Sequence, residues 1–363
     1  MRRNPLPGVA LLVLGVAVGC AISPVASAAA GEVSQLIATL KTGTPDAREH
    51  AAERLACGYC GYTDEAVSAL VALLADGDDQ QRADAAYALT LIDDGGRFTP
   101  HLNALLGAFN NDAYWRVRAN LAYVLAAMPD SSQVFTALRD ALHDSDAHVR
   151  AAGVYNLEAV AGAQKANAKI VPDLLSALSD VERTVRYAAA TGLAKIGSTD
   201  RHTVDVLAGR LGVEPDPWVR GALAGALGAA GEAAAPALPA LIKAIVDPYP
   251  LYVAEPATRA IARMGPVGIP ALVAALGYDM LGDGRVVAAA VDGLAQMPGP
   301  LADRLGGDLK NGPEAVRSGI AQVLGRRAQE AAVAIPLLKG ALDDPEPAVR
   351  ADAAQALAKL ADK

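Results

Sequence analysis

The residue with the clearest chemical potential in this sequence is an arginine within a pattern that recurs about every 30 to 36 residues. Its planar guanidinium can donate two parallel hydrogen bonds to one carboxylate or phosphate, which the point charge of lysine does not offer. Two further copies of the surrounding pattern carry Ala254 or Val287 instead. The eight arginines are Arg48, Arg82, Arg118, Arg150, Arg186, Arg220, Arg317 and Arg350.

An acidic residue lies in the predicted turn before most of these arginines. A cation at the start of a helix interacts unfavourably with the helix dipole, so each arginine needs an anion nearby. We therefore interpret the arginines as a structural ladder of Arg–Asp contacts between units rather than as a ligand site. The aspartates would also cap helices. They are Asp46, Asp78, Asp112, Asp146, Asp180, Asp216 and Asp344.

The remaining titratable groups are too scattered to predict a catalytic or metal site. His143 and His148 are five residues apart across a turn, a poor spacing for one helical face. The sequence lacks His-Glu-x-x-His, Gly-x-Ser-x-Gly and phosphate-binding loop motifs. We therefore predict no catalytic residue, no metal and no cofactor. The histidines are His50, His101, His143, His148 and His202.

The N-terminal residues have the pattern of a secretory signal peptide. Arg2 and Arg3 precede an uncharged apolar run over residues 9–22, and Ala26-Ser27-Ala28 offers a small-x-small cleavage site. We predict a cleaved signal peptide over residues 1–28 and an exported protein in the periplasm, the cell envelope or the medium. A second interpretation makes Cys20 the lipidated residue of a lipoprotein. No later stretch is long and apolar enough to predict a membrane span.

Cys57 and Cys60 form a Cys-x-x-Cys pair, and they are the only cysteines left after cleavage. No second such pair or histidine cluster completes a zinc site, and no thioredoxin-like context surrounds them. In an exported chain the pair is best explained as a local disulfide.

The repeated arginines belong to a larger repeated unit. Upstream of most of them lies an apolar run with residues recurring at three and four, for example residues 171–178 and 335–342. Each unit therefore reads as two helices joined by an acidic turn. Leu193 follows Arg186 by seven residues, and Gly197 ends that helix. A period in this range predicts a helical array in which each unit packs on its neighbours.

The sequence resembles the HEAT repeat family, in particular the bacterial HEAT-like repeats that include phycobilin lyases. Segments 146–152, 216–223 and 344–357 carry the resemblance, through Asp, Val-Arg and the small residues that follow. It implies an all-α, right-handed α-solenoid of about ten helix-pair repeats over residues 29–363. The lyase relationship implies an alternative function, an enzyme or enzyme accessory binding a small cofactor in the groove.

Three tyrosines stand five residues after a repeat arginine: Tyr87, Tyr123 and Tyr155. In a HEAT-type solenoid this position lies on the second-helix face, which is concave. Because amphipathic aromatic residues are enriched at interfaces, we predict a protein or peptide partner bound there. By contrast, the second helix of the sixth unit, Gly221 to Gly231, has no side chain at its outward positions that could react with or bind a ligand.

The charge balance argues against nucleic acid as the partner. The formal net charge is −8, and removal of Arg2 and Arg3 leaves 40 acidic against 30 basic residues. Binding to phosphate backbones requires the opposite sign. We therefore predict an exported, non-catalytic scaffold or binding module. The sequence leaves the partner's identity and the oligomeric state open.

Overall fold

A computed structural model describes residues 26–55, 63–92, 96–128, 131–278 and 284–361. Within these ranges every regular element is helical, and the twenty α-helices follow one another as ten pairs. Cys20, Cys57, Cys60 and the first 25 residues lie outside the described residues. Lipidation, the disulfide and export therefore stay predictions.

The chain divides into two compact units, residues 1–101 and 102–363. The first unit contains two helix pairs, α1 (Ala26–Thr42) with α2 (Pro45–Leu55) and α3 (Thr63–Asp76) with α4 (Asp79–Thr90). Its core is aliphatic, and Leu40, Leu55, Leu70 and Leu89 are fully buried.

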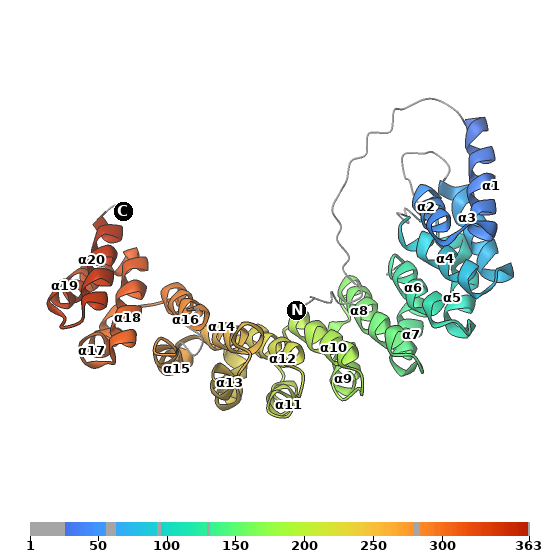
Figure 1. The fold of residues 1–363 in the computed structure, drawn as a ribbon. Helices are drawn as coiled ribbons and strands as arrows, with labels where there is room; N and C mark the ends of the chain where they lie inside the picture. The colour runs from blue at the N-terminus through green and yellow to red at the C-terminus, as the bar shows by residue number, and fades with distance from the viewer. Residues whose placement is uncertain (1–25, 56–62, 93–95, 129–130, 279–283, 362–363) are drawn as a thin grey trace. The chain divides into compact units, whose positions relative to one another are not determined.

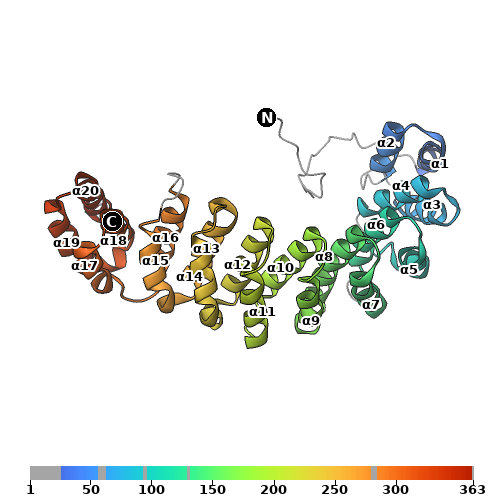
Figure 2. The ribbon, with the colours of Figure 1, turned by 60° about the horizontal axis from the view of Figure 1, so that its bottom comes forward.

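The second unit contains eight helix pairs. In Figures 1 and 2 its even-numbered helices follow one another in one row and its odd-numbered helices in a second row. Successive even-numbered helices pack directly on each other, and each also packs on the odd-numbered helix before it. The odd-numbered helices are α5 (Leu102–Asn111), α7 (Ser132–Asp140), α9 (Asn167–Ala177), α11 (Arg201–Leu211), α13 (Leu238–Ile245), α15 (Ile269–Ala275), α17 (Ala302–Asn311) and α19 (Ala331–Gly340). The even-numbered helices are α6 (Trp115–Ala126), α8 (Ala147–Ala163), α10 (Arg183–Ile196), α12 (Pro217–Ala229), α14 (Glu255–Arg263), α16 (Arg285–Gln296), α18 (Glu314–Arg326) and α20 (Pro347–Ala361).

Helix α10 shows how the sequence produces this pattern. Its alanine-rich stretch has high helix propensity, and Val185, Ala189 and Leu193 bury one stripe. Gly197 ends the helix in a left-handed conformation with φ of 61°, which glycine adopts without the strain of a side chain. Each of the eight repeat arginines is the fourth residue of its helix, so the helix starts are in register throughout.

Glycines let neighbouring even-numbered helices approach closely. A Cβ atom added at Gly325 of α18 would lie 2.6 Å from the Cβ of Ala356 in α20. One added at Gly221 of α12 would lie 2.0 Å from the carbonyl oxygen of Tyr252. Tyr252 belongs to η4 (Pro250–Ala254), a π-helical turn that leads into α14 where the repeat arginine is missing. No side chain larger than hydrogen fits at either glycine without movement of its neighbour.

A buried arginine that the sequence interpretation did not single out joins α16 to α18. Arg327 is completely buried and donates to the carbonyls of Leu294, Ala295 and Met297 at 2.8–3.1 Å. Its guanidinium also pairs with Glu330, which accepts the backbone N–H groups of Leu301 and Ala302 at 2.7 Å. Burial alone would raise the pKa of the Glu330 carboxyl, but these amides and Arg327 lower it.

Candidate functional site

The repeat arginines of the second unit from Arg118 to Arg317 each hydrogen-bond to two neighbouring turns, whereas Arg350, within the described ranges, donates only to the turn before its own helix. Nη1 of Arg118 donates to the carbonyl of Asp112 at 2.6 Å, within the turn before its own helix. Nε and Nη2 donate to both carboxylate oxygens of Asp144 in the next helix pair, at 2.8 and 2.7 Å. This bidentate geometry is the one that a guanidinium provides and an ammonium does not.

The same arrangement repeats as a relay. The carbonyl of Asp144 accepts from Arg150 at 2.9 Å, while Arg150 binds the carboxylate of Asp180 at 2.7 and 2.8 Å. Arg186 binds the carboxylate of Glu214 at 2.8 and 3.0 Å. Further along, Arg220 binds Asp247, Arg317 binds Asp344, and Arg350 donates to the carbonyl of Asp344.

The acidic partner is not one of the predicted aspartates at several arginines: Arg220 binds Asp247, Arg48 binds Asp84, and Arg118 and Arg186 also differ. Arg118 binds Asp144 and not Asp146, and Arg186 binds Glu214 and not Asp216. Asp146 is an N-cap whose carboxylate accepts the backbone N–H of His148 at 2.8 Å, so it points along its own helix. Asp216 likewise caps α12. The aspartates four residues before Arg150 and Arg220 therefore cap their own helices, and the acids six residues before them bind the arginine of the preceding helix pair.

The arginines of the first unit make related but less regular contacts. Arg48 pairs with Asp84 at 2.7 Å and donates weakly to the carbonyl of Gly43. Arg82 donates to the carbonyl of Gly77 and to Asp79, both at 2.9 Å. Asp78 caps α4 with a complete capping box.

The ladder changes the pKa of its members. Burial alone would raise the pKa of the Asp144 carboxyl, but hydrogen bonds from Arg118 and the N–H of Asp146 lower it. The same balance lowers the pKa of Asp180. The hydrogen bonds to Glu214 raise the pKa of Arg186. The ladder guanidiniums are thus already hydrogen-bonded to acceptors within the protein. The side chains that are available to bind a partner lie on another surface of these helices.

We call that surface of the second unit the second-helix face. It consists of the residues one, five and nine positions after each repeat arginine, or after Ala254 and Val287 where the arginine is missing. Tyr123 of α6 and Tyr155 of α8 occupy the fifth position and are half-buried. Tyr187 of α10 occupies the first position and is 37% exposed. Because positions one and five are one helical turn apart, all three point the same way.

The three tyrosines are close enough to affect one another. Burial raises the pKa of the Tyr155 phenol, and the neighbouring Tyr187 and Tyr123 raise it further. Burial also raises the pKa of Tyr123. The predicted group did not include Tyr187, although its position four residues before the fifth position of the same helix was a usable signal.

Tyr87, the third tyrosine of the predicted row, belongs to the first unit. It is 37% exposed on α4, and burial followed by the charges of Glu49 and Glu53 raises its pKa. Tyr123 and Tyr155 therefore share a unit and a surface. Tyr87 lies on its own unit, next to acidic residues of α2.

Other aromatic residues stack across turns between successive pairs. Trp115 lies on His148 with ring centroids 4.3 Å apart and planes at 20°. Trp218, 45% exposed, lies against Tyr252 at 4.2 Å. The guanidinium carbon of Arg220 lies 5.8 Å from the ring centroid of Tyr249. Of these rings, Tyr249 lies against a ladder arginine.

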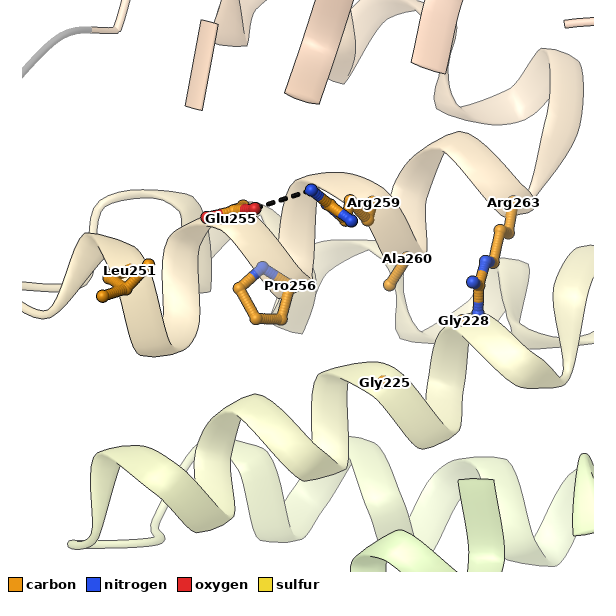
Figure 3. A pocket seen from close by; sticks show the side chains of 8 residues that line it. All are labelled: Gly225, Gly228, Leu251, Glu255, Pro256, Arg259, Ala260 and Arg263. Atoms are coloured by element: carbon orange, nitrogen blue, oxygen red, sulfur yellow. Dashed lines mark hydrogen bonds and ion pairs between the residues drawn. The ribbon is translucent and has the colours of Figure 1, made fainter. Parts of the chain in front are cut away.

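A pocket of about 300 Å³ lies between α12 and α14 on the second-helix face. Gly225 and Gly228 form its floor, and Leu251 with Pro256 gives it an apolar end. Figure 3 shows Arg259 paired with Glu255, at 2.7 Å, while Arg263 extends towards Gly228. The glycines that the sequence assigned no chemistry therefore create a depression, because they place no side chain between the two helices.

The structure brings no metal-binding set together: no group of three or more His, Cys, Asp or Glu suited to a metal ion occurs in the described ranges. Within those same ranges, no helix combines the length and apolar character needed to cross a membrane.

A family model described as HEAT repeats matches residues 156–228, 171–262 and 303–363. Among curated proteins, none matches the sequence significantly. A crystal structure of Kap121p matches with a TM-score of 0.60 at 13% identity, covering 93% of this chain and 41% of that one. A crystal structure of importin beta matches with a TM-score of 0.61 at 14% identity, covering 91% and 51%.

The chain thus spans about two fifths to one half of the length of these structures. At such identity the likeness shows the fold alone, and it confirms the predicted all-α solenoid of HEAT-like helix pairs.

Proposed function

The chain belongs to the HEAT repeat family, and on this premise we propose that it is a non-catalytic binding module for a protein or peptide partner. The partner contacts the second-helix face at Tyr123 and Tyr155, and Tyr87 is a separate contact position on the first unit. The observation that carries the proposal is the cluster of Tyr123, Tyr155 and Tyr187. These side chains are neither fully buried nor committed to the ladder.

The chemistry of this cluster favours a macromolecular partner over a small cofactor. Tyrosine provides a large apolar area with a polar end at low entropic cost, and it is enriched at protein interfaces. The pocket between α12 and α14, at about 300 Å³, is at the low end of the range of roughly 300–1,000 Å³ typical of small-molecule sites. It is lined by residues of α12, η4 and α14, with no histidine or tyrosine among them.

The test is a set of tyrosine variants assayed by cross-linking capture from the native cell envelope. Replacing Tyr87, Tyr123 and Tyr155 with alanine should abolish partner capture while the helical circular dichroism remains. Tyr187→Ala, at an exposed position, should weaken capture without a change in stability. Tyr249→Ala, which alters a ring that is 49% exposed at a turn, is the control and should leave capture intact. Capture undiminished in the triple variant would contradict the assignment.

The module acts outside the cytoplasm in this proposal. The apolar run over residues 9–22 and the Ala26-Ser27-Ala28 site support export by the general secretory route. Mass spectrometry of the mature protein should find a free N-terminus at Ala29, and reducing agent should alter its mobility through Cys57 and Cys60. A diacylglyceryl group on Cys20 would make it a lipoprotein instead, and an intact Met1 would contradict export.

A further inference from the structure

The pocket between α12 and α14 has a local charge opposite in sign to the net charge of the whole chain. Arg259 and Arg263 contribute two positive charges and Glu255 one negative charge, so the lining carries a net charge of about +1 at neutral pH. The whole chain has a formal net charge of −8. A local positive site in an anionic protein favours a single anion over a polyanion, because the surrounding field opposes a second charge.

The two arginines differ in what they already bind. Arg259 pairs with Glu255 at 2.7 Å across one helical turn, but its side chain is 65% exposed, so this pair contributes little. No residue in the described part of the chain pairs with the guanidinium of Arg263. Its Cδ lies 3.6 Å from the position of a Cβ added at Gly228, so its stem rests over the glycine floor. Arg263 can therefore donate a bidentate pair to an incoming carboxylate.

The opposite end of the pocket is apolar. Leu251 is 44% exposed, and Pro256 lies beside it in the first turn of α14. A Cβ at Gly225 would meet no atom within 4 Å, so the floor between the two ends is open. The pocket therefore presents an aliphatic surface at one end and a cation at the other.

We propose that this pocket is a carboxylate subsite for the extended peptide partner, in which Arg263 binds the carboxylate and Leu251 with Pro256 contacts the aliphatic part of the same or the adjacent residue. The inference rests on the proposed function, because it assigns a chemical feature to the segment bound along the second-helix face. The carboxylate comes from an acidic side chain or from the C-terminus of the peptide, and both sources share this chemistry.

The spacing of the helices fixes how far the carboxylate lies from the aromatic contacts. Helices α8, α10, α12 and α14 pack on one another in that order. Neighbouring packed helices are about 8–10 Å apart, so the axis of α8, which carries Tyr155, and the axis of α14, which carries Arg263, are separated by roughly 24–30 Å. An extended chain rises about 3.3 Å per residue, so about seven to nine residues span this distance. Tyr187 lies one helix nearer and requires about five or six.

The experiment uses the full-length chain on synthetic arrays of random ten-residue peptides, printed with the C-terminus either free or amide-linked. The wild-type protein should retain peptides that carry an acidic residue or a free carboxylate five to nine positions from an apolar or aromatic residue. Exchange of that Asp or Glu for Asn or Gln should weaken binding about tenfold or more, as loss of a charged hydrogen bond does. Enrichment on both arrays identifies a side chain, and enrichment on the free-terminus array alone identifies the C-terminus.

Three variants make the assignment specific. Arg263→Gln should remove the acidic preference while binding through the aromatic positions continues. Gly225→Leu should fill the pocket floor with the same result and without loss of stability. Gly209→Leu, at another helical glycine with no atom within 4 Å of its added Cβ, is the matched control on α11 and should bind as the wild type does.

The two proposals fail in different ways. Peptides selected without acidic enrichment, or an acidic preference that persists in Arg263→Gln, would overturn the subsite and leave the proposed function intact. Failure to retain any peptide would overturn both. Preferential retention of single-stranded oligonucleotides would also overturn the subsite, because it would show that phosphate rather than carboxylate is its ligand.

Discussion

Removal of the Glu214 carboxylate tests the ladder at its most buried step. The Glu214 side chain is fully buried, and that of its partner Arg186 is 8% exposed. The carboxylate accepts two hydrogen bonds from Arg186 at 2.8 and 3.0 Å and one from Arg210 at 3.2 Å. It also accepts the backbone N–H of Asp216 at 3.1 Å, which orders the turn before α12.

Glu214→Ala leaves the guanidinium of Arg186 buried with only the carbonyls of Asp180 and Val181, both at 2.9 Å, as acceptors. Breaking a buried ion pair by removing one partner costs about 3–5 kcal/mol. That is a large part of a typical free energy of unfolding of about 5–15 kcal/mol. Arg186→Met should cost less, about 2–3 kcal/mol, because Glu214 keeps Arg210 and the N–H of Asp216 as donors.

The measurement is denaturant unfolding of each variant together with hydrogen exchange in α9 to α12. A repeat array can lose cooperativity, and local exchange then reports the damaged step directly. The double variant Arg186→Met/Glu214→Leu should be less destabilised than the sum of the single changes by about 1–3 kcal/mol. Arg201→Met is the control, since its pair with Asp205 is exposed and should contribute no more than about 1 kcal/mol. Additive single changes, or a Glu214→Ala effect no larger than the control, would refute the ladder.

Three further results are expected. Arg327→Met should lower the free energy of unfolding by about 3–5 kcal/mol in denaturant titrations, since it removes the guanidinium that donates to four buried carbonyls and pairs with Glu330. Gly325→Ala should destabilise by about 1–3 kcal/mol because its Cβ meets Ala356 at 2.6 Å, whereas Gly225→Ala should be neutral or stabilising by up to about 1 kcal/mol; equal effects would contradict the packing. The lowered pKa values of ladder carboxyls such as Asp144 mean that their contribution is complete above the ordinary aspartate value of about 3.9 and is lost as pH falls through the folded value. Unfolding titrations should therefore show stability falling below about pH 4, and an Asp144→Asn variant should show a shallower fall.

The amino-acid sequence by itself determined the helix pairs and their order. The step from Arg186 to Leu193 and the glycine at 197 recur with the period of a helical unit, and local propensity and patterning decide such features without distant contacts. The choice of arginine over lysine also predicted a bidentate acceptor in the turns. Both follow from neighbours within a few residues along the chain.

Only the tertiary structure decided which acid binds which arginine. Asp144 and Asp146 stand in one turn, and the sequence offers no reason to prefer either as the partner of Arg118. The choice follows from direction, because the carboxylate of Asp146 turns along its own helix while that of Asp144 faces the preceding pair. The cage around Arg327 has the same origin, since its carbonyls come from residues about 30 positions earlier.

The sequence likewise identified only part of the candidate site, and the tertiary structure supplied the rest. Spacing identified Tyr123 and Tyr155, but Tyr187 joins them through the stacking of α10 on α8, which a one-dimensional pattern does not contain. In the sequence, Gly225 has no side chain and therefore predicts no function. It becomes the floor of a pocket because α14 places Arg259 and Arg263 beside it, and a cavity is a property of two surfaces in contact.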